Sequence, residues 1–151
     1  MAVHRRPQAL RHLSLAALAL ALLAPLAACG GGSVGNDPPN NKRICDAYGG
    51  QLTNGEVVAD GTVRQILGER RGRSGDHEGY LIQLGGDCDL VLKVETNTDI
   101  TGPIPLRPGE RVVVKGVYIY NPMGGLIHWT HHDPGGRHEG GFVKAGGLLY
   151  Q

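Results

Sequence analysis

The stretch RVVVKGVYIY, residues 111–120, carries the strongest strand signal in the chain. β-Branched and aromatic side chains fill it, and these favour a pleated, half-buried surface. Gly116 interrupts the run, and a glycine inside a strand pattern indicates a bulge or a sharp bend. Beyond residue 28 no segment keeps a helical apolar spacing for three turns, and 25 of the 151 residues are glycine. The sequence therefore predicts an all-β fold.

Shorter β-rich runs lie on both sides of this strand. They are residues 61–67, 80–84, 90–94 and 125–130. Gly85, Gly86 and Asp87 form a hairpin-turn signal between the second and third of the five strands. Two further runs, residues 142–144 and 148–150, predict a C-terminal hairpin.

Five strands, a glycine kink and a long third connection favour one architecture. We expect a small, partly open five-stranded barrel similar to the oligonucleotide/oligosaccharide-binding (OB) type. Residues 106–112 (LRPGERV) resemble the turn before the fourth strand of many such barrels. Residues 95–105 are too short and too rich in proline and glycine to supply the helix that usually follows the third strand. A six- or seven-stranded sandwich is the alternative.

The N-terminus has the layout of a secretion signal. Arg5, Arg6 and Arg11 form a positive head, and an apolar stretch follows over residues 13–26. This stretch is shorter than the roughly 20 residues that a membrane-spanning helix needs. We therefore predict a signal peptide over residues 1–28.

The residues around the expected cleavage point suggest lipid attachment. Leu26, Ala27, Ala28 and Cys29 resemble a bacterial lipobox, which implies cleavage before Cys29 and acylation of its thiol. Glycine rather than aspartate after the cysteine implies the outer membrane. The expected location is the periplasmic side of the cell envelope, with the membrane contacted through the lipid; a soluble periplasmic form is the alternative.

The rest of the chain divides into a tether and one domain. Residues 29–43 lack apolar periodicity and predict the anchor followed by a flexible tether. Residues 44–151 are enough for one small core, so a single β-barrel domain is expected there.

The number of cysteines predicts one disulfide bond. If Cys29 carries lipid, Cys45 and Cys88 remain, and in an oxidising compartment we expect them to form a disulfide. Two unpaired, buried cysteines are the alternative.

Without residues 1–28 the chain has twelve basic and fourteen acidic side chains, a net charge of −2. Net charge therefore does not favour nucleic acid as a partner.

The stretch GGLIHWTHHDPGGRH, residues 124–138, holds four of the five histidines beyond residue 28. Strand alternation predicts that His128 and His131 point to opposite faces. Pro134 must end the strand because it cannot donate to a ladder. Two glycines follow, and they allow a reversal that would bring His138 back beside His131 or Asp133.

The closing part of the chain resembles a known family. The run HWTHHDPGGRH and the ending LLYQ, together with HEGYLIQL at residues 77–84, are similar to small bacterial secreted proteins called domain of unknown function 3465. The resemblance spans residues 61–151. It brings no activity with it. The chain departs from the family pattern at Glu78, where glutamine is usual, and at residues 93–96.

The histidines suggest two kinds of chemistry. Mixed imidazole and carboxylate ligands suit Zn²⁺ or a similar divalent ion, with His131, Asp133 and His138 as the candidate ligands. A metal-dependent hydrolase of phosphodiesters, nuclease-like in type, would add His77 or His132 as the general base.

A site without metal is the competing hypothesis. It would bind a small anionic ligand through forked hydrogen bonds and ring stacking. The candidate residues are Arg70, Arg71, Arg73, His77, Tyr80, His128, Trp129 and Arg137. A binding module is favoured over an enzyme because no set of nucleophile, base and orienting group can be identified from the sequence.

Two further hypotheses stay open. In the first, His128 and Trp129 are packing residues in or beside the barrel, with their ring N–H groups bonded to backbone carbonyls. An envelope interaction protein would instead expose Tyr118, Tyr120 and Trp129 to a protein partner.

Overall fold

The computed structural model describes Met1 and residues 37–86 and 88–151. The chain divides into two units, Met1–Gly31 and Gly32–Gln151, and the fold below is that of the second unit. The predicted signal peptide, the lipid attachment at Cys29 and most of the predicted tether lie outside the described residues.

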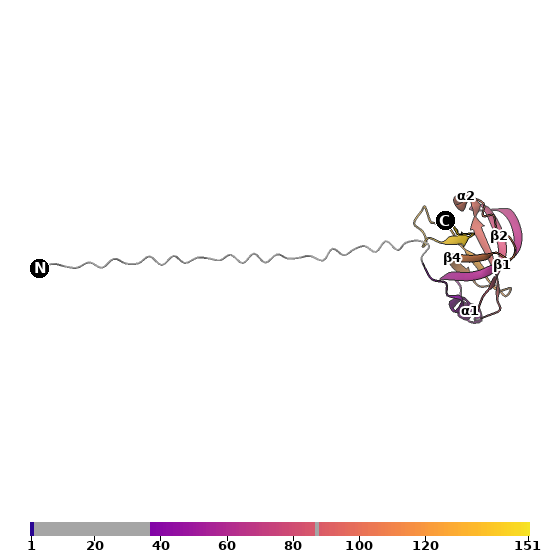
Figure 1. The fold of residues 1–151 in the computed structure, drawn as a ribbon, viewed down its shortest axis with the longest axis horizontal. Helices are drawn as coiled ribbons and strands as arrows, with labels where there is room; N and C mark the ends of the chain where they lie inside the picture. The colour runs from indigo at the N-terminus through magenta and orange to yellow at the C-terminus, as the bar shows by residue number, and fades with distance from the viewer. Residues whose placement is uncertain (2–36, 87) are drawn as a thin grey trace. The chain divides into compact units, whose positions relative to one another are not determined.

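The described residues are mainly β-structure, which confirms the predicted fold class (Figure 1). The strands are β1 (Gly55–Gly72), β2 (Gly75–Leu84), β3 (Val91–Asn97), β4 (Arg111–Ile119), β5 (Leu126–His128), β6 (Phe142–Ala145) and β7 (Leu148–Tyr150). The helices are α1 (Asn41–Gly49) and α2 (Thr98–Thr101).

Five of the strands pair in a ring. β1 pairs antiparallel with β2 and β4, β2 pairs antiparallel with β3, and β5 joins β4 antiparallel and β3 parallel. The β3–β5 link has only two residue pairs, Lys93 with Leu126 and Val94 with Ile127, so the ring is barely closed there. This is the predicted OB-like arrangement. β6 pairs with β4 and with β7, which confirms the C-terminal hairpin.

β1 is much longer than the sequence predicted. Its first part pairs with β4, and from Gly61 onward it pairs with β2 as far as Gly72. The arginine-rich segment after Leu67 is therefore the outer part of a long β-hairpin, because Arg70 and Arg71 still face His77 and Asp76 in register. Two register shifts interrupt the β1–β2 ladder and bend the strand.

Gly116 does not form the bulge that its position predicted. β4 pairs with β1 without a break from Arg111 to Tyr118. The glycine instead allows β5 to approach, because a Cβ atom at Gly116 would lie 2.9 Å from Ile127 Cγ2 and 3.1 Å from Thr130 Cγ2.

The core fills the interior of the ring. Its largest fully buried side chains include Tyr80, Ile82, Leu92, Val114, Tyr118 and Ile127. Glu78 is half-buried, and its carboxylate accepts a hydrogen bond from the Ile104 N–H. Burial raises the pKa of Glu78 to about 7, the Ile104 hydrogen bond opposes the rise, and Glu69 adds to it.

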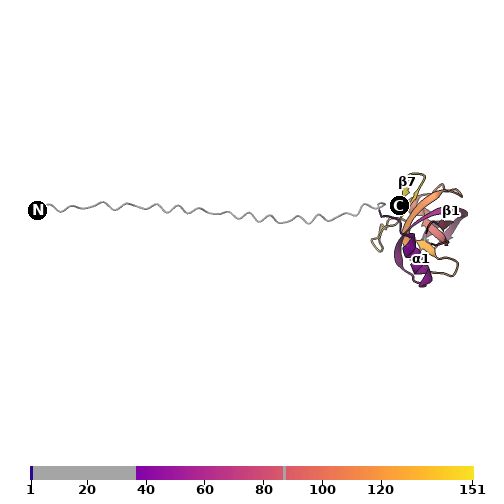
Figure 2. The same ribbon diagram turned by 60° about the horizontal axis from the view of Figure 1, so that its bottom comes forward.

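The sequence missed both helices. Asn40 caps α1 by accepting a hydrogen bond from the Arg43 N–H, and Ile44 is fully buried. α2 is a single turn after β3, so the connection predicted to lack a helix has a short one, capped by Asn97. The two helices lie at opposite ends of the ring (Figure 1), and α1 lies across the near end of the strands in Figure 2. Neither helix, within the described part of the chain, is long and apolar enough to cross a membrane.

Cys45 and Cys88 form a disulfide, as predicted. The bond joins α1 to the segment between β2 and β3, with 43 residues of sequence separation and 6.1 Å between the Cα atoms. It therefore fixes the helix to the ring.

Candidate functional site

The histidine stretch departs from strand geometry earlier than expected. β5 ends at His128, and Trp129 has a φ of 52°, in the left-handed region. This reversal ends the alternation of side chains, so the prediction that His128 and His131 face opposite ways is wrong. Both line one cleft of about 640 Å³.

We call this hollow the histidine cleft. Its walls include Asn54, Ser74, Asn97, His128, Trp129, His131, Arg137 and His138. These residues come from the position just before β1, the turn of the β1–β2 hairpin, the end of β3, and β5 with the loop after it. The cleft therefore lies where four separate parts of the chain meet.

Asp133 organises the loop after β5. Its carboxylate accepts hydrogen bonds from the N–H groups of Gly135 at 2.9 Å, Arg137, and His138 at 2.8 Å. Burial alone would raise the pKa of Asp133, but these hydrogen bonds lower it to about 2. The side chain is only 2% exposed. Asp133 thus holds the chain reversal that Gly135 and Gly136 predicted, and the reversal brings His138 back to the site.

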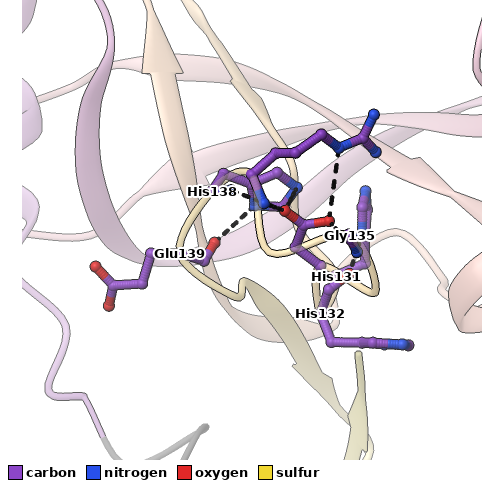
Figure 3. Close-up of polar contacts among 7 residues, drawn as sticks. His131, His132, Gly135, His138 and Glu139 are labelled. Atoms are coloured by element: carbon purple, nitrogen blue, oxygen red, sulfur yellow. Dashed lines mark hydrogen bonds and ion pairs between the residues drawn. The ribbon is translucent and has the colours of Figure 1, made fainter.

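Three histidines have a defined tautomer. Nδ1 of His131 lies 2.6 Å from the His132 carbonyl oxygen, and Nδ1 of His138 lies 2.8 Å from that of Glu139 (Figure 3). Nδ1 of His77 lies 2.9 Å from the Gly75 carbonyl oxygen. A carbonyl oxygen only accepts, so Nδ1 carries the proton in each ring. When the ring is neutral, Nε2 keeps its lone pair for a proton, a ligand or a metal.

Five rings lie in consecutive contact, and we call them the ring series. His77 stacks on His128 with centroids 5.4 Å apart, and Trp129 meets His128 edge-on at 4.9 Å. His138 lies 6.0 Å from Trp129 and 5.5 Å from His131. Burial lowers the pKa values of His128 and His131, so both are neutral near pH 7.

A smaller hollow of about 170 Å³ adjoins the cleft. We call it the arginine hollow; its walls are Arg70, Gly72, Arg73, Ser74, His77, Glu95 and His128. Arg70 and Lys93 bind the buried Glu95 carboxylate at 2.5 and 2.6 Å. Although burial raises the pKa of Glu95, the hydrogen bonds from Lys93 and Arg70 bring it below its usual value. Ser74 and His128 belong to both hollows.

Lys115 binds the C-terminal part of the loop after β5. Its Nζ binds Asp37 at 2.6 Å and also binds the Glu139 carboxylate. The lysine side chain is 9% exposed, so both pairs are partly shielded from water. Near them lies Glu56, whose pKa is raised by burial and by Glu139. The segment before α1 and the end of the loop therefore share one ammonium group.

Some predicted site residues lie elsewhere. Tyr80 is 1% exposed and packs in the core, and Tyr118 is equally buried, so neither offers a surface to a ligand or partner. Arg71 forms an exposed pair with Asp76 at 4.0 Å. His132 is exposed, and its ring points away from His138 (Figure 3).

The predicted metal ligands are neighbours without forming a closed set. His138 Nε2 lies 3.9 Å from Asp133 Oδ2, and His131 meets His138 edge-on. Within residues 37–86 and 88–151 no group of three or more His, Cys, Asp and Glu side chains is arranged to hold a metal ion.

Ser74 and Asn97 are among the site residues that carried no recognised signal in the sequence. Ser74 lies in the hairpin turn, and Asn97 donates a hydrogen bond to its carbonyl oxygen at 2.8 Å. Asn97 also caps α2. Only the hairpin register brings the two together, and the sequence did not reveal how far the hairpin extends.

A family model described as "Protein of unknown function (DUF3465)" matches residues 34–151. The chain belongs to the DUF3465 family. The match confirms the resemblance found in the sequence and extends it through β1 and α1 of the DUF3465 domain. No curated protein and no solved structure matches the chain.

Proposed function

We propose that the DUF3465 domain is a binding module for a small anionic ligand that contains a flat ring. The ring series carries this proposal, because its five rings are in contact and four of them line a cleft large enough for such a ligand. Stacking on aromatic faces accepts any planar ring.

Charge around the cleft supports an anion. Glu95 is already neutralised by Arg70 and Lys93, and Asp133 accepts three N–H groups. Arg137 lines the cleft with a side chain that is 84% exposed, and Arg73 lines the adjoining hollow. A guanidinium group binds carboxylate or phosphate through paired, charge-assisted hydrogen bonds.

Trp129 is the chain's single tryptophan, so its fluorescence reports on the cleft. We expect adenosine monophosphate to change this fluorescence saturably, and Arg137→Ala to weaken its binding about tenfold through loss of a charge-assisted hydrogen bond. Adenosine and inorganic pyrophosphate, which each lack one of the two features, should bind more weakly.

Arg71→Ala is the matched control, because the Arg71 side chain is as exposed as that of Arg137, at 84%, and lines neither hollow. It should bind adenosine monophosphate as the wild type does. Equal losses in the two variants, or no response to any of the three probes, would contradict the proposal.

A divalent cation such as Zn²⁺ is the second candidate ligand. The hydrogen bonds that place a proton on Nδ1 of His131 and His138 leave both Nε2 atoms as donors to a metal. Asp133 is already occupied by N–H groups, so water or a bound anion would complete the coordination. Bound metal would also supply the nucleophile for a hydrolase, with His77 as the base, because the His132 ring points away from His138.

Calorimetric titration with Zn²⁺ tests this second candidate. We expect one site per chain, lost in His131→Ala because half of the protein ligands are removed. His132→Ala should retain the site, since that ring points away from His138. Identical heats in wild type and His131→Ala would rule out these ligands and, with them, the metal-dependent hydrolase.

We also propose that the protein is anchored in the cell envelope through lipid on Cys29, facing the periplasm from the outer membrane. The lipobox-like sequence supports this, and so does the disulfide, since disulfides persist in oxidising compartments. In cells fed labelled palmitate, the wild type should be labelled and Cys29→Ser should not. Equal labelling of both would exclude Cys29 as the anchor.

A further inference from the structure

The turn of the β1–β2 hairpin places a hydroxyl beside an imidazole. Ser74 Oγ lies 3.4 Å from His77 Nε2, and the Gly75 carbonyl oxygen lies 2.9 Å from Nδ1 of the same ring. Because Nδ1 carries the proton, Nε2 is the acceptor and the serine hydroxyl donates to it. These are the nucleophile, base and orienting group of covalent catalysis.

We propose that Ser74 is a nucleophile, that His77 is its general base, and that the pair cleaves a carboxylic ester in an anionic ligand. The substrate class rests on the proposed function, because the histidine cleft would hold the ligand. The pair itself rests only on the contacts described here.

The pair is held in place from several sides. Asn97 donates to the Ser74 carbonyl oxygen at 2.8 Å, and the Asp76 N–H donates to Asp99 at 3.0 Å, so β3 and α2 fix the turn. His77 is 5% exposed and stacks on His128. The imidazole therefore has little freedom to turn away from the hydroxyl.

Ser74 also lies where a substrate could reach it. Ser74 is exposed and lines both the histidine cleft and the arginine hollow. Arg73 lines the arginine hollow beside it. A guanidinium group there would stabilise the negative charge that develops on the ester oxygen.

The reaction has two balanced halves. In the first, Ser74 Oγ bonds to the carbonyl carbon and passes its proton to His77 Nε2, which donates it to the departing alcohol as the ester C–O bond breaks. In the second, water gives a proton to His77 and its oxygen attacks the acyl-serine. The carboxylic acid leaves, and the proton returns to Ser74 Oγ.

A fluorophosphonate probe tests the pair without requiring the natural ligand. We expect stoichiometric labelling of the wild type, mapped by mass spectrometry to Ser74, and none in Ser74→Ala. His77→Gln should slow labelling about 100-fold, the usual contribution of a general base. Thr62→Ala, a variant of an exposed hydroxyl residue on the preceding strand β1, should be labelled as the wild type is.

Circular dichroism checks that each variant is folded. Ser74→Cys provides a second measure of the base. Alkylation of this cysteine by iodoacetamide should be slower when His77→Gln is also present. No labelling of the folded wild type, or labelling unaffected by His77→Gln, would overturn the proposal. The adenosine monophosphate titration is independent of these results. Labelling without binding would refute the proposed ligand class and keep the nucleophile, whereas binding without labelling would do the opposite.

Discussion

Gly141→Ala is expected to destabilise the domain by roughly 3 kcal/mol and to disorder the histidine loop. A Cβ atom at Gly141 would lie 2.6 Å from the Lys115 carbonyl oxygen and 2.9 Å from Thr130 Cα, and it would also meet the Trp129 carbonyl oxygen. These neighbours are backbone atoms, so no side chain can rotate to make room. The free energy of unfolding, measured with urea, should fall accordingly.

The same variant should weaken ligand binding. The Gly141 N–H donates to the His131 carbonyl oxygen at 2.8 Å and closes the loop that brings His138 back. Gly140→Ala is the matched control, because the nearest atom to a Cβ atom there is His132 Cα at 3.7 Å, an ordinary contact. If both alanine variants unfold at the same urea concentration, close approach at Gly141 is not what the fold requires.

Removing the disulfide should have the largest effect on stability. Replacement of Cys45 and Cys88 by serine frees a loop of 43 residues in the unfolded chain, which costs about 4 kcal/mol on the chain-entropy model. This loop contains β1 and β2, the hairpin that carries Ser74 and His77. Denaturant unfolding at neutral pH measures the change.

The wild type in excess dithiothreitol provides the comparison for the serine variant. The two should unfold at the same denaturant concentration, because each lacks the same crosslink. If the reduced wild type unfolded at the same denaturant concentration as the oxidised protein, the disulfide would not contribute to the stability of the fold.

Local patterns predicted the strands well and their ends poorly. Alternation and β-branched residues identified the seven strands of the described residues, and the family resemblance was correct. β1 extends past Gly68 because cross-strand pairing with β2 outweighs the weak strand propensity of a glycine- and arginine-rich segment. α1 is short with a single buried residue, Ile44, so it leaves no apolar periodicity to detect.

The site was predictable only where a residue imposes its own geometry. Pro134 and the glycines after it indicated a reversal, and the chain does return His138 to His131. The left-handed turn at Trp129 has no such signal, since a bulky residue rarely adopts that conformation. The Ser74–His77 contact depends on hairpin register, which tertiary pairing sets.

The ammonium group of Lys115 has a mechanical consequence. It binds Asp37, which precedes the first helix, and Glu139, which directly follows His138 in the chain. Tension on the segment that contains Asp37 would therefore act on the same ammonium group that binds Glu139, the neighbour of the cleft residue His138. One lysine thus links the segment before α1 to the residue that follows His138.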